Sequence, residues 1–218
     1  MSIFVHTANL GGFDVIQPPE AQVGVEMTWR LFGDADFPPR PCAMTRRLQA
    51  KIPKMFGWDL APGYDTYVWH DASLRLSKPD SVAWLTAPLA NHDLVIFRHP
   101  WRTSIAEEAD YLRTKLANDS RYIIRRYYNE DLDGQMRAVQ DGAYVDDHLY
   151  AGGCFAYRPT TWVKGALTDW WVHTSRFHCI DQLALPYVLA QRGVHVAVID
   201  EDIYHSSHLE FTRAKGHG

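Results

Sequence analysis

Two acidic turns, each following an apolar run, contain the side chains of this sequence best suited to bind a metal ion. The first is FGDADF, with Asp34 and Asp36, and the second is VWHDASL, with Asp71. A carboxylate at a strand end can bind Mg²⁺ or Mn²⁺, which prefer oxygen ligands, and the small Ala72 and Ser73 leave room for a phosphate. Because an isolated Asp in a turn more often bonds to its own backbone, each turn also has a purely structural alternative.

A pair of histidines near the end of the chain could complete such a metal site. His205 and His208 are three residues apart in DEDIYHSSHL, which is a predicted loop. Mn²⁺ accepts imidazole as well as oxygen ligands, so either histidine could join Asp71 if the fold brings them together. The alternative is an ordinary polar surface loop.

Two further pairs have positions that suit an anionic or hydroxyl-bearing ligand. Arg47 and Lys51 lie one helical turn apart on one face of the predicted helix 44–55, where they could approach a phosphate. Asp181 and Gln182 stand in a predicted amphipathic helix, where they could contact a substrate hydroxyl. The structural alternatives are a solvated basic face for the first pair and an acid favoured by the helix dipole for the second.

The elements that must position these residues alternate between strands and helices. The expected strands are residues 2–5, 23–32, 64–70, 93–97, 151–157 and 194–199. The expected helices are residues 44–55, 81–85, 104–116, 120–132, 161–174 and 179–191. This order is typical of an α/β fold with a mostly parallel sheet. Ligands of such sheets bind beyond the carboxyl ends of the strands. One rim is therefore expected to hold four residues that follow predicted strands: Asn9, Asp34, Asp71 and His99.

The composition limits the class of protein. The 218 residues suit a single domain, and the net charge of −4 gives no basic surface for nucleic acid. Three cysteines without metal-binding spacing predict a reduced compartment. Without a signal peptide or an apolar run of about 20 residues, the protein is expected to be cytoplasmic with no transmembrane segment. The final AKGHG could be the edge of a longer chain. Eight Trp and eleven Tyr favour an aromatic pocket for sugars or flat bases, although core packing accounts for most of them.

Five sequence blocks, taken in order, resemble a glycosyltransferase-like family. They are VHTANLGGFD, the FGD strand end, YDTYVWHDASLRL, IFRHPWRTSIAEEADYL, and LYAGGCFAYRPTTW followed by CIDQLALPYVL. The family was long catalogued as a domain of unknown function, and its plant members act in the formation of cell-wall and mucilage polysaccharides. The chain is also similar to small nucleotide-sugar transferases of large algal viruses. The resemblance covers nearly the whole chain.

This resemblance implies a GT-A fold, which is a nucleotide-binding α/β/α sandwich with a metal-bridged diphosphate. It implies one domain over residues 1–218, with a nucleotide-binding half at about 1–100 and an acceptor-binding and sugar-binding half at about 101–218. VWHDAS then takes the place of the Asp-x-Asp motif, so that Asp71 is the metal ligand. Ser73 replaces the second acid and binds through its hydroxyl or a water, or else His205 or His208 completes the site, with His205 preferred.

The resemblance also implies roles for the other candidates. The nucleotide would contact Thr7, Ala8, Asn9, Asp34, Arg47, Lys51 and His70. The sugars would contact His99, Arg102, Glu108, Gly152 and Gly153. The catalytic pair would be Asp181 and Gln182. An acceptor site could be shaped by Trp162, Trp170 and Trp171, although core packing explains them equally well.

The predicted function is a metal-dependent transfer of a hexosyl or deoxyhexosyl group from a UDP-sugar to a hydroxyl of a glycan or another acceptor. In an inverting enzyme Asp181 would be the general base. In a retaining enzyme Asp181 and Gln182 would instead hold the donor sugar, and the Asp-Gln pair favours this by analogy. Two alternatives are a metal-dependent phosphoesterase or nucleotidyltransferase, with Asp146–Asp147 supplying extra carboxylates, and a non-catalytic domain that binds a nucleotide-sugar.

Overall fold

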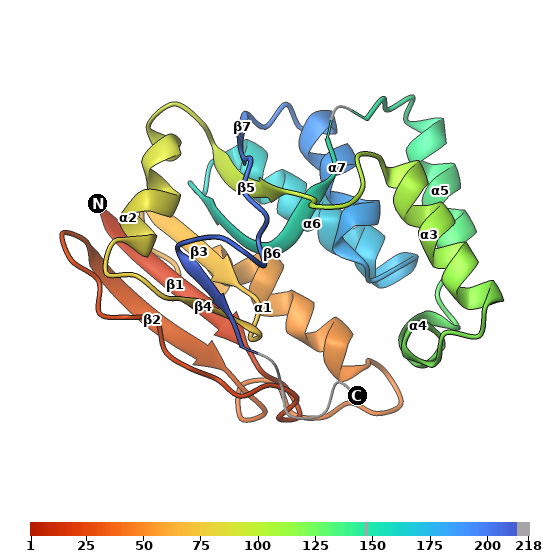
Figure 1. The fold of residues 1–218 in the computed structure, drawn as a ribbon, viewed down its shortest axis with the longest axis horizontal. Helices are drawn as coiled ribbons and strands as arrows, with labels where there is room; N and C mark the ends of the chain where they lie inside the picture. The colour runs from red at the N-terminus through yellow and green to blue at the C-terminus, as the bar shows by residue number, and fades with distance from the viewer. Residues whose placement is uncertain (147, 213–218) are drawn as a thin grey trace.

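The computed structural model describes residues 1–146 and 148–212, and its centre is a six-stranded sheet (Figure 1). The strand order is β2-β1-β3-β6-β5-β7. These strands are β1 (Ser2–Ala8), β2 (Glu26–Phe32), β3 (Thr66–His70), β5 (Leu94–Arg98), β6 (Tyr150–Tyr157) and β7 (Val196–Ile199). Parallel pairing joins β1 to β2 and β3, and β5 to β7, whereas β6 is antiparallel to both of its neighbours. Five strands therefore share one direction, and the predicted mostly parallel α/β sheet is confirmed.

Helices cover both faces of this sheet. The α-helices are α1 (Arg46–Leu60), α2 (Ser81–Thr86), α3 (Ile105–Ala117), α4 (Arg121–Tyr127), α5 (Leu132–Asp141), α6 (Thr161–Arg176) and α7 (Leu185–Gln191). Two short 3₁₀ helices are η1 (Ala87–Ala90) and η2 (Asp181–Leu183). A small second sheet pairs β4 (Leu74–Leu76) antiparallel to β8 (Leu209–Phe211). In Figure 1, α3, α4 and α5 gather at the end of the molecule opposite β2.

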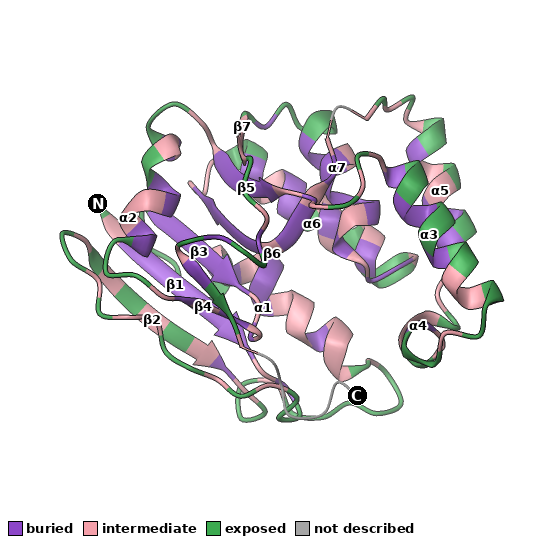
Figure 2. Ribbon diagram, viewed as in Figure 1, coloured by how far each residue is buried: buried purple, intermediate pink, exposed green. Residues whose placement is uncertain are grey.

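Two apolar clusters fix the layers. On one face of the sheet, Met55 of α1 and Trp170 of α6 pack with side chains of α7. On the other face, Val82 and Leu85 of α2 pack with side chains of the β4–β8 sheet. The central strands are buried along most of their length, as expected for strands covered on both faces, whereas the edge strand β2 alternates between partly buried and exposed residues (Figure 2). The predicted α/β/α sandwich is therefore confirmed.

Helix α1 lies unusually close to β1. Thr45 caps the helix by accepting a hydrogen bond from the backbone N–H of Leu48 at 3.1 Å, and Pro53 lies inside it. The helix is kinked near Phe56, as is common after an internal proline. A Cβ added to Gly57 would lie 2.3 Å from Nε2 of His6, so only glycine allows this approach. The close packing holds one face of α1 against the carboxyl ends of β1 and β3.

Several predicted boundaries were wrong. The single helix expected at 179–191 is η2 followed by α7, because Pro186 is accommodated only near the start of a helix. The helix expected at 120–132 ends at Tyr127, and α5 was not predicted. The short strands β4 and β8 were also missed, since three residues give little periodic signal.

Candidate functional site

A cleft of about 1680 Å³ opens at the carboxyl ends of the parallel strands. Asn9 follows β1, Asp71 follows β3 and His99 follows β5, and all three line the cleft. Gly152 and Gly153 reach the same rim from β6, which runs in the opposite direction. Three of the four residues expected to share a rim are thus brought together, and Asp34 is the exception.

The cleft is cationic although the chain as a whole is negative. Eight Lys and Arg side chains line it, against four Asp and Glu side chains. The cations are Arg46, Arg47, Lys51, Lys54, Arg102, Arg121, Arg125 and Arg126. The acids are Asp14, Asp71, Glu108 and Asp181. With a chain net charge of −4, this local excess of positive charge favours an anionic ligand in the cleft.

Two lysines and two carboxylates form the floor of the cleft. Lys51 Nζ and Lys54 Nζ each donate to Asp181 at 2.6 Å, one to each carboxylate oxygen. Lys54 Nζ also donates to Oδ1 of Asp71 at 3.1 Å. Only 1% of the Lys54 side chain is exposed, so its ammonium group interacts with these two carboxylates and hardly with solvent. Lys54 was not among the predicted site residues, although its position three residues after Lys51 on a helix places both on one face.

The charges of this cluster keep Asp181 ionised. Burial would raise the pKa of Asp181, but Lys51 and Lys54 outweigh burial and lower it below the usual value. Burial would lower the pKa of Lys51, but attraction to Asp181 and Asp71, together with the hydrogen bond to Asp181, raises it above the usual value. An ionised carboxylate that already accepts from two ammonium groups is a weak base. The arrangement therefore suits Asp181 for positioning a ligand better than for removing a proton.

Asp71 and Ser73 present oxygen atoms that fit part of a divalent metal site. Oδ1 of Asp71 accepts from Lys54 and from Nε1 of Trp69 at 2.8 Å. Within residues 1–146 and 148–212, no hydrogen-bond donor contacts Oδ2 of Asp71, and 42% of this side chain is exposed. Ser73 lines the cleft two residues further on. One carboxylate and one hydroxyl are a sufficient protein contribution for Mg²⁺ or Mn²⁺ when diphosphate and water oxygens supply the remaining ligands.

The two predicted histidine ligands do not meet Asp71. Nδ1 of His205 pairs with Asp202 at 2.7 Å, and 82% of the His205 side chain is exposed. The ring of His208 stacks on Trp84 of α2, with centroids 4.2 Å apart. Neither histidine lines the cleft. The part of the chain that the structure describes contains no cluster of three or more His, Cys, Asp or Glu side chains able to hold a metal ion. The described contacts of His205 and His208 are thus with Asp202 and Trp84, and their role as metal ligands stays a prediction.

The residues predicted to contact the nucleotide divide into two groups. Ala8 and Asn9 line the cleft, and the Asn9 side chain bonds to the backbone of Asp14, which fixes the intervening glycine turn. Thr7 and His70 are buried below the surface of the cleft and do not line it. Nδ1 of His70 lies 2.9 Å from the carbonyl oxygen of Leu74, so this histidine fixes the turn that carries Asp71.

Asp34 has a structural partner in place of the predicted nucleotide contact. Its carboxylate pairs with the guanidinium of Arg46 and accepts from the backbone N–H of Gly11 at 2.9 Å. Gly11 has a φ of +81°, a conformation that favours glycine. Asp34 therefore supports the glycine turn from outside the cleft.

The basic residues of α4 extend the cationic wall. Arg121, Arg125 and Arg126 line the cleft and were not among the predicted site residues. Arg47 donates to the backbone carbonyl of Arg126 at 3.0 Å, and its guanidinium lies over the ring of Tyr127. Arg47 thus joins α1 to α4 across the cleft.

The residues predicted on the sugar side also lie together. Arg102 pairs with the buried Glu108 and stacks 4.1 Å over the ring of Tyr111. Nδ1 of His99 accepts from the backbone N–H groups of Trp101 and Arg102 at 3.3 and 3.1 Å. Burial, with help from the charge of Arg102, lowers the pKa of His99 to about 4. His99 is therefore neutral near pH 7.

The predicted catalytic pair and the two glycines line the same cleft. Asp181 and Gln182 line the cleft at η2. A Cβ added to Gly152 would lie 3.0 Å from Cβ of Asp181, and one added to Gly153 would lie 3.5 Å from Oδ2 of Asp71. The two glycines of β6 therefore let Asp181 of η2 and the turn that carries Asp71 approach the sheet backbone.

The tryptophans considered for an acceptor site do not line the cleft. Trp170 is fully buried, and Trp171 packs on Phe56. Trp162 is exposed but lies outside the cleft. Trp101 and Tyr204, which sequence reading did not single out, line the cleft instead.

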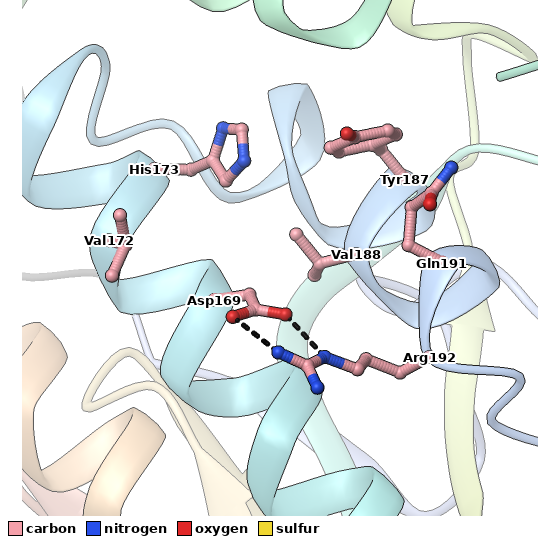
Figure 3. Close-up of a pocket in the computed structure, with 7 residues that line it drawn as sticks. All are labelled: Asp169, Val172, His173, Tyr187, Val188, Gln191 and Arg192. Carbon is pink, nitrogen blue, oxygen red and sulfur yellow. Dashed lines mark hydrogen bonds and ion pairs between the residues drawn. The ribbon is translucent and has the colours of Figure 1, made fainter. Parts of the chain in front are cut away.

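A second, smaller hollow of about 380 Å³ lies between α6 and α7 (Figure 3). Asp169 and Arg192 are joined there by two parallel hydrogen bonds, of 2.6 and 3.0 Å. Figure 3 shows His173 and Tyr187 on the same pocket, with no predicted site residue among its lining. Nδ1 of His173 lies 3.1 Å from the amide oxygen of Gln135. Asp169 and Arg192 are thus paired with each other, and His173 and Gln191 bond to Gln135 and Gly142 outside the pocket lining.

The phosphoesterase alternative expected extra carboxylates from Asp146 and Asp147. Oδ2 of Asp146 accepts from the backbone N–H of Ile105 at the start of α3, and Asp147 lies outside the described residues. Asp146 does not line the cleft, so it adds no carboxylate beside Asp71.

None of the helices in residues 1–146 and 148–212 has the length and apolar character needed to cross a membrane.

Comparison with known proteins gives distant structural similarities only. No family model and no curated protein sequence matches the chain. Mouse xyloside xylosyltransferase 1 in its apo form has a TM-score of 0.49 at 8% identity, with 92% of this chain and 86% of that chain covered. A197 from STIV has a TM-score of 0.35 at 7% identity, covering 92% and 82%.

A third solved structure is glucosyl-3-phosphoglycerate synthase from Mycobacterium tuberculosis, in complex with Mg²⁺ and UDP. Its TM-score is 0.36 at 15% identity, with 91% of this chain and 69% of that chain covered. At these TM-scores and identities, none of the three similarities assigns an activity to this chain. The fold class rests on the sheet of this chain itself.

Proposed function

We propose that this chain is a GT-A glycosyltransferase that binds a nucleoside-diphosphate sugar in the cleft and transfers its sugar to a hydroxyl of a glycan or another acceptor. The observation that carries the proposal is the cationic cleft at the strand ends, with Lys51, Lys54, Asp181 and Asp71 on its floor. A diphosphate supplies the negative charge that this cleft lacks. UDP is the proposed nucleotide. This choice rests on the sequence resemblance alone, because Asp34, which was predicted to contact the nucleotide, does not line the cleft.

The reaction requires stabilisation of the leaving group. The bond between the anomeric carbon and the diphosphate oxygen breaks, and its electron pair stays on that oxygen. Arg47, Lys51 and the α4 arginines surround the cleft and would stabilise this charge. A divalent ion bound by Asp71, Ser73 and the diphosphate would neutralise further charge on the same oxygens. The acceptor oxygen forms the new bond to the anomeric carbon and releases its proton.

Asp181 is proposed to hold the donor sugar, together with Gln182. Its carboxylate is ionised and bonded to two lysines, which makes it a poor general base. The proton of the acceptor would then pass to the departing diphosphate. This arrangement favours the retaining alternative. The transferred group is proposed to be hexosyl or deoxyhexosyl, whichever stereochemical course the reaction takes.

The phosphoesterase alternative needs more carboxylates around the metal than the cleft provides. Of the four acids that line it, Asp181 is bonded to two lysines and Glu108 to Arg102. The cluster around Asp71 is therefore lysine-rich where a two-metal centre would be acid-rich.

Product analysis separates these functions. The protein is incubated with a panel of UDP-sugars, with Mn²⁺ or with EDTA, and the nucleotide products are identified. The proposal predicts UDP together with free sugar or a glycoside, and a loss of turnover in Asp181→Asn but not in the surface control Asp169→Asn. UMP as the product would instead indicate a phosphoesterase, and intact donor despite binding would indicate a non-catalytic domain. Metal dependence that persists in Asp71→Ala would contradict the assignment of Asp71 as the metal ligand.

A further inference from the structure

Exposed aromatic side chains are concentrated in the cleft. Eight Phe, Trp and Tyr side chains of the described residues are exposed, and six of them line this one cleft. The six are Phe13, Trp101, Tyr111, Tyr122, Tyr204 and Phe211. Exposed apolar surface gathered in one place marks a binding site more often than chance exposure.

Trp101 and Tyr204 form the centre of this aromatic surface. Their rings are stacked, with centroids 5.4 Å apart and planes at 12°. Phe211 contacts the edge or face of Tyr204 at 5.3 Å and a steep angle of 86°, which supports Tyr204. Trp101 nevertheless remains 64% exposed. Tyr204 thus stacks on Trp101 from a loop far away in the sequence and supports it, while Trp101 keeps an exposed apolar face in the cleft.

The polar groups beside this surface suit a sugar ring. A pyranose has an apolar C–H face that packs on an aromatic ring and hydroxyls at its edge that need hydrogen-bond partners. His99 lies in edge contact with Trp101 at 5.7 Å, and the Arg102 guanidinium lies 6.0 Å from the Trp101 ring. Both side chains carry donors for hydroxyl oxygens. A flat apolar surface next to fixed donors therefore matches a carbohydrate.

The strand order separates this surface from the nucleotide end of the cleft. Asn9 follows β1, and Trp101 follows β5, with β3 and β6 between these two strands. Three strand spacings amount to about 14 Å. Asp71 and Gly152, at the ends of the two intervening strands, place the reacting centre between them. A ligand on Trp101 would thus lie on the side of the reacting centre away from the nucleoside.

Tyr204 lines the same cleft as Asp71 and Gly153. Ile203, the preceding residue, would lie 3.3 Å from a Cβ on Gly153. A sugar stacked on this surface would therefore have its hydroxyls within reach of the donor.

We propose that the exposed face of Trp101, supported by Tyr204, is a stacking platform for a pyranose ring of the acceptor. This inference rests on the proposed function and names the acceptor as a carbohydrate. The platform selects by ring face, and the neighbouring His99 and Arg102 fix the orientation of the ring.

Saturation-transfer NMR with a panel of methyl pyranosides, recorded with UDP present, tests the platform. Trp101→Ala is compared with wild type and with Trp162→Ala, which removes a tryptophan of similar exposure (60%) outside the cleft. We expect at least one glycoside to bind wild type and Trp162→Ala, and to bind Trp101→Ala about tenfold more weakly or not at all. Trp101→Phe retains an aromatic face and should restore part of the binding. UDP affinity, measured separately, should be the same in all four proteins.

Each other result has a definite meaning. If wild type binds UDP but no glycoside, or if Trp101→Ala binds glycosides as well as wild type does, the platform is overturned while the proposed function stands. If Trp101→Ala loses UDP affinity, the surface holds the nucleobase and the acceptor assignment is wrong. If wild type binds glycosides but not UDP, the proposed donor fails while the platform survives.

Discussion

The cleft and the pocket between α6 and α7 each contain an aspartate paired with a cationic side chain. The two pairs differ in whether their charged groups are satisfied by each other or shared with a further carboxylate. In the pocket, Asp169 and Arg192 satisfy each other through two parallel bonds at the surface. In the cleft, Lys54 is shared between Asp181 and Asp71, and one oxygen of Asp71 is left to the cleft. A closed pair at the surface stabilises locally and needs no ligand, whereas a buried, shared cluster beside extra arginines can reorganise around an anion. The difference explains why the cleft, and not the pocket, is the candidate site.

Removal of the central carboxylate of each region should have the most unequal effect. Asp181→Ala leaves Lys51 and Lys54 buried without this partner, which should lower the free energy of unfolding by about 3–5 kcal/mol. Asp169→Ala removes a surface pair and should cost at most about 1 kcal/mol. Urea denaturation of both variants measures these changes. Equal losses would show that the buried cluster is no more important to stability than the surface pair.

A methyl group added beside each pair should have opposite effects. Gly152→Ala places a Cβ 3.0 Å from Cβ of Asp181 and should cost about 1–3 kcal/mol while weakening UDP binding. Gly165→Ala, in α6 beside Arg192, meets its nearest atom at 3.4 Å, and alanine favours a helix over glycine by about 1 kcal/mol. It should therefore be neutral or stabilising. Thermal unfolding distinguishes the two variants, and a stabilised Gly152→Ala would contradict the close approach of η2 to β6.

The acid dependence of stability should also depend on the cleft. The pKa of Asp181 is lowered in the folded chain, so its contribution is present above the unfolded pKa of about 3.9. That contribution is lost as the pH falls through the lower folded value. Asp181→Asn should therefore show a shallower loss of stability below about pH 4 than wild type or Asp169→Asn. Identical profiles of unfolding free energy against pH in all three proteins would show that the charge cluster does not cause the acid dependence of stability.

A further pH effect on stability is expected in the range between pH 6.5 and 3. Burial lowers the pKa of His6, which packs between β1 and α1, to about 3. In the unfolded chain this histidine takes up a proton below about pH 6.5, so stability should fall gradually as the pH decreases from there. NMR titration of His6 should show a neutral ring down to about pH 4. Protonation near pH 6.5 would contradict the tight packing of α1 on β1.

Much of the fold, and the rim itself, could be predicted from the sequence because both follow from local patterns. Asn9, Asp71 and His99 end apolar strands, and parallel strands bring such ends together. Arg47 and Lys51, four residues apart, could be placed on one helix face from their spacing alone. Lys54, three residues after Lys51, could have been added by the same rule. The roles of these residues remain predictions.

The positions that escaped sequence reading depend on contacts between distant segments. The path of the loop that carries His205 and His208 is fixed by the pairing of β4 with β8, which sets Leu76 opposite Leu209. Strands of three residues give no periodic signal, so the turn of His208 toward Trp84 was not visible. The pairing of Asp34 with Arg46 is likewise a tertiary contact.

Calorimetric titration of UDP tests the central claim most directly. Wild type is compared with Lys51→Gln in the cleft and with Arg192→Gln in the pocket. We expect wild type and Arg192→Gln to bind UDP equally, and Lys51→Gln to bind about tenfold more weakly, since a charge-assisted hydrogen bond contributes about 1.5–3 kcal/mol. Absence of UDP binding to wild type, or equal affinity in all three proteins, would contradict the assignment of the cleft as the nucleotide-sugar site.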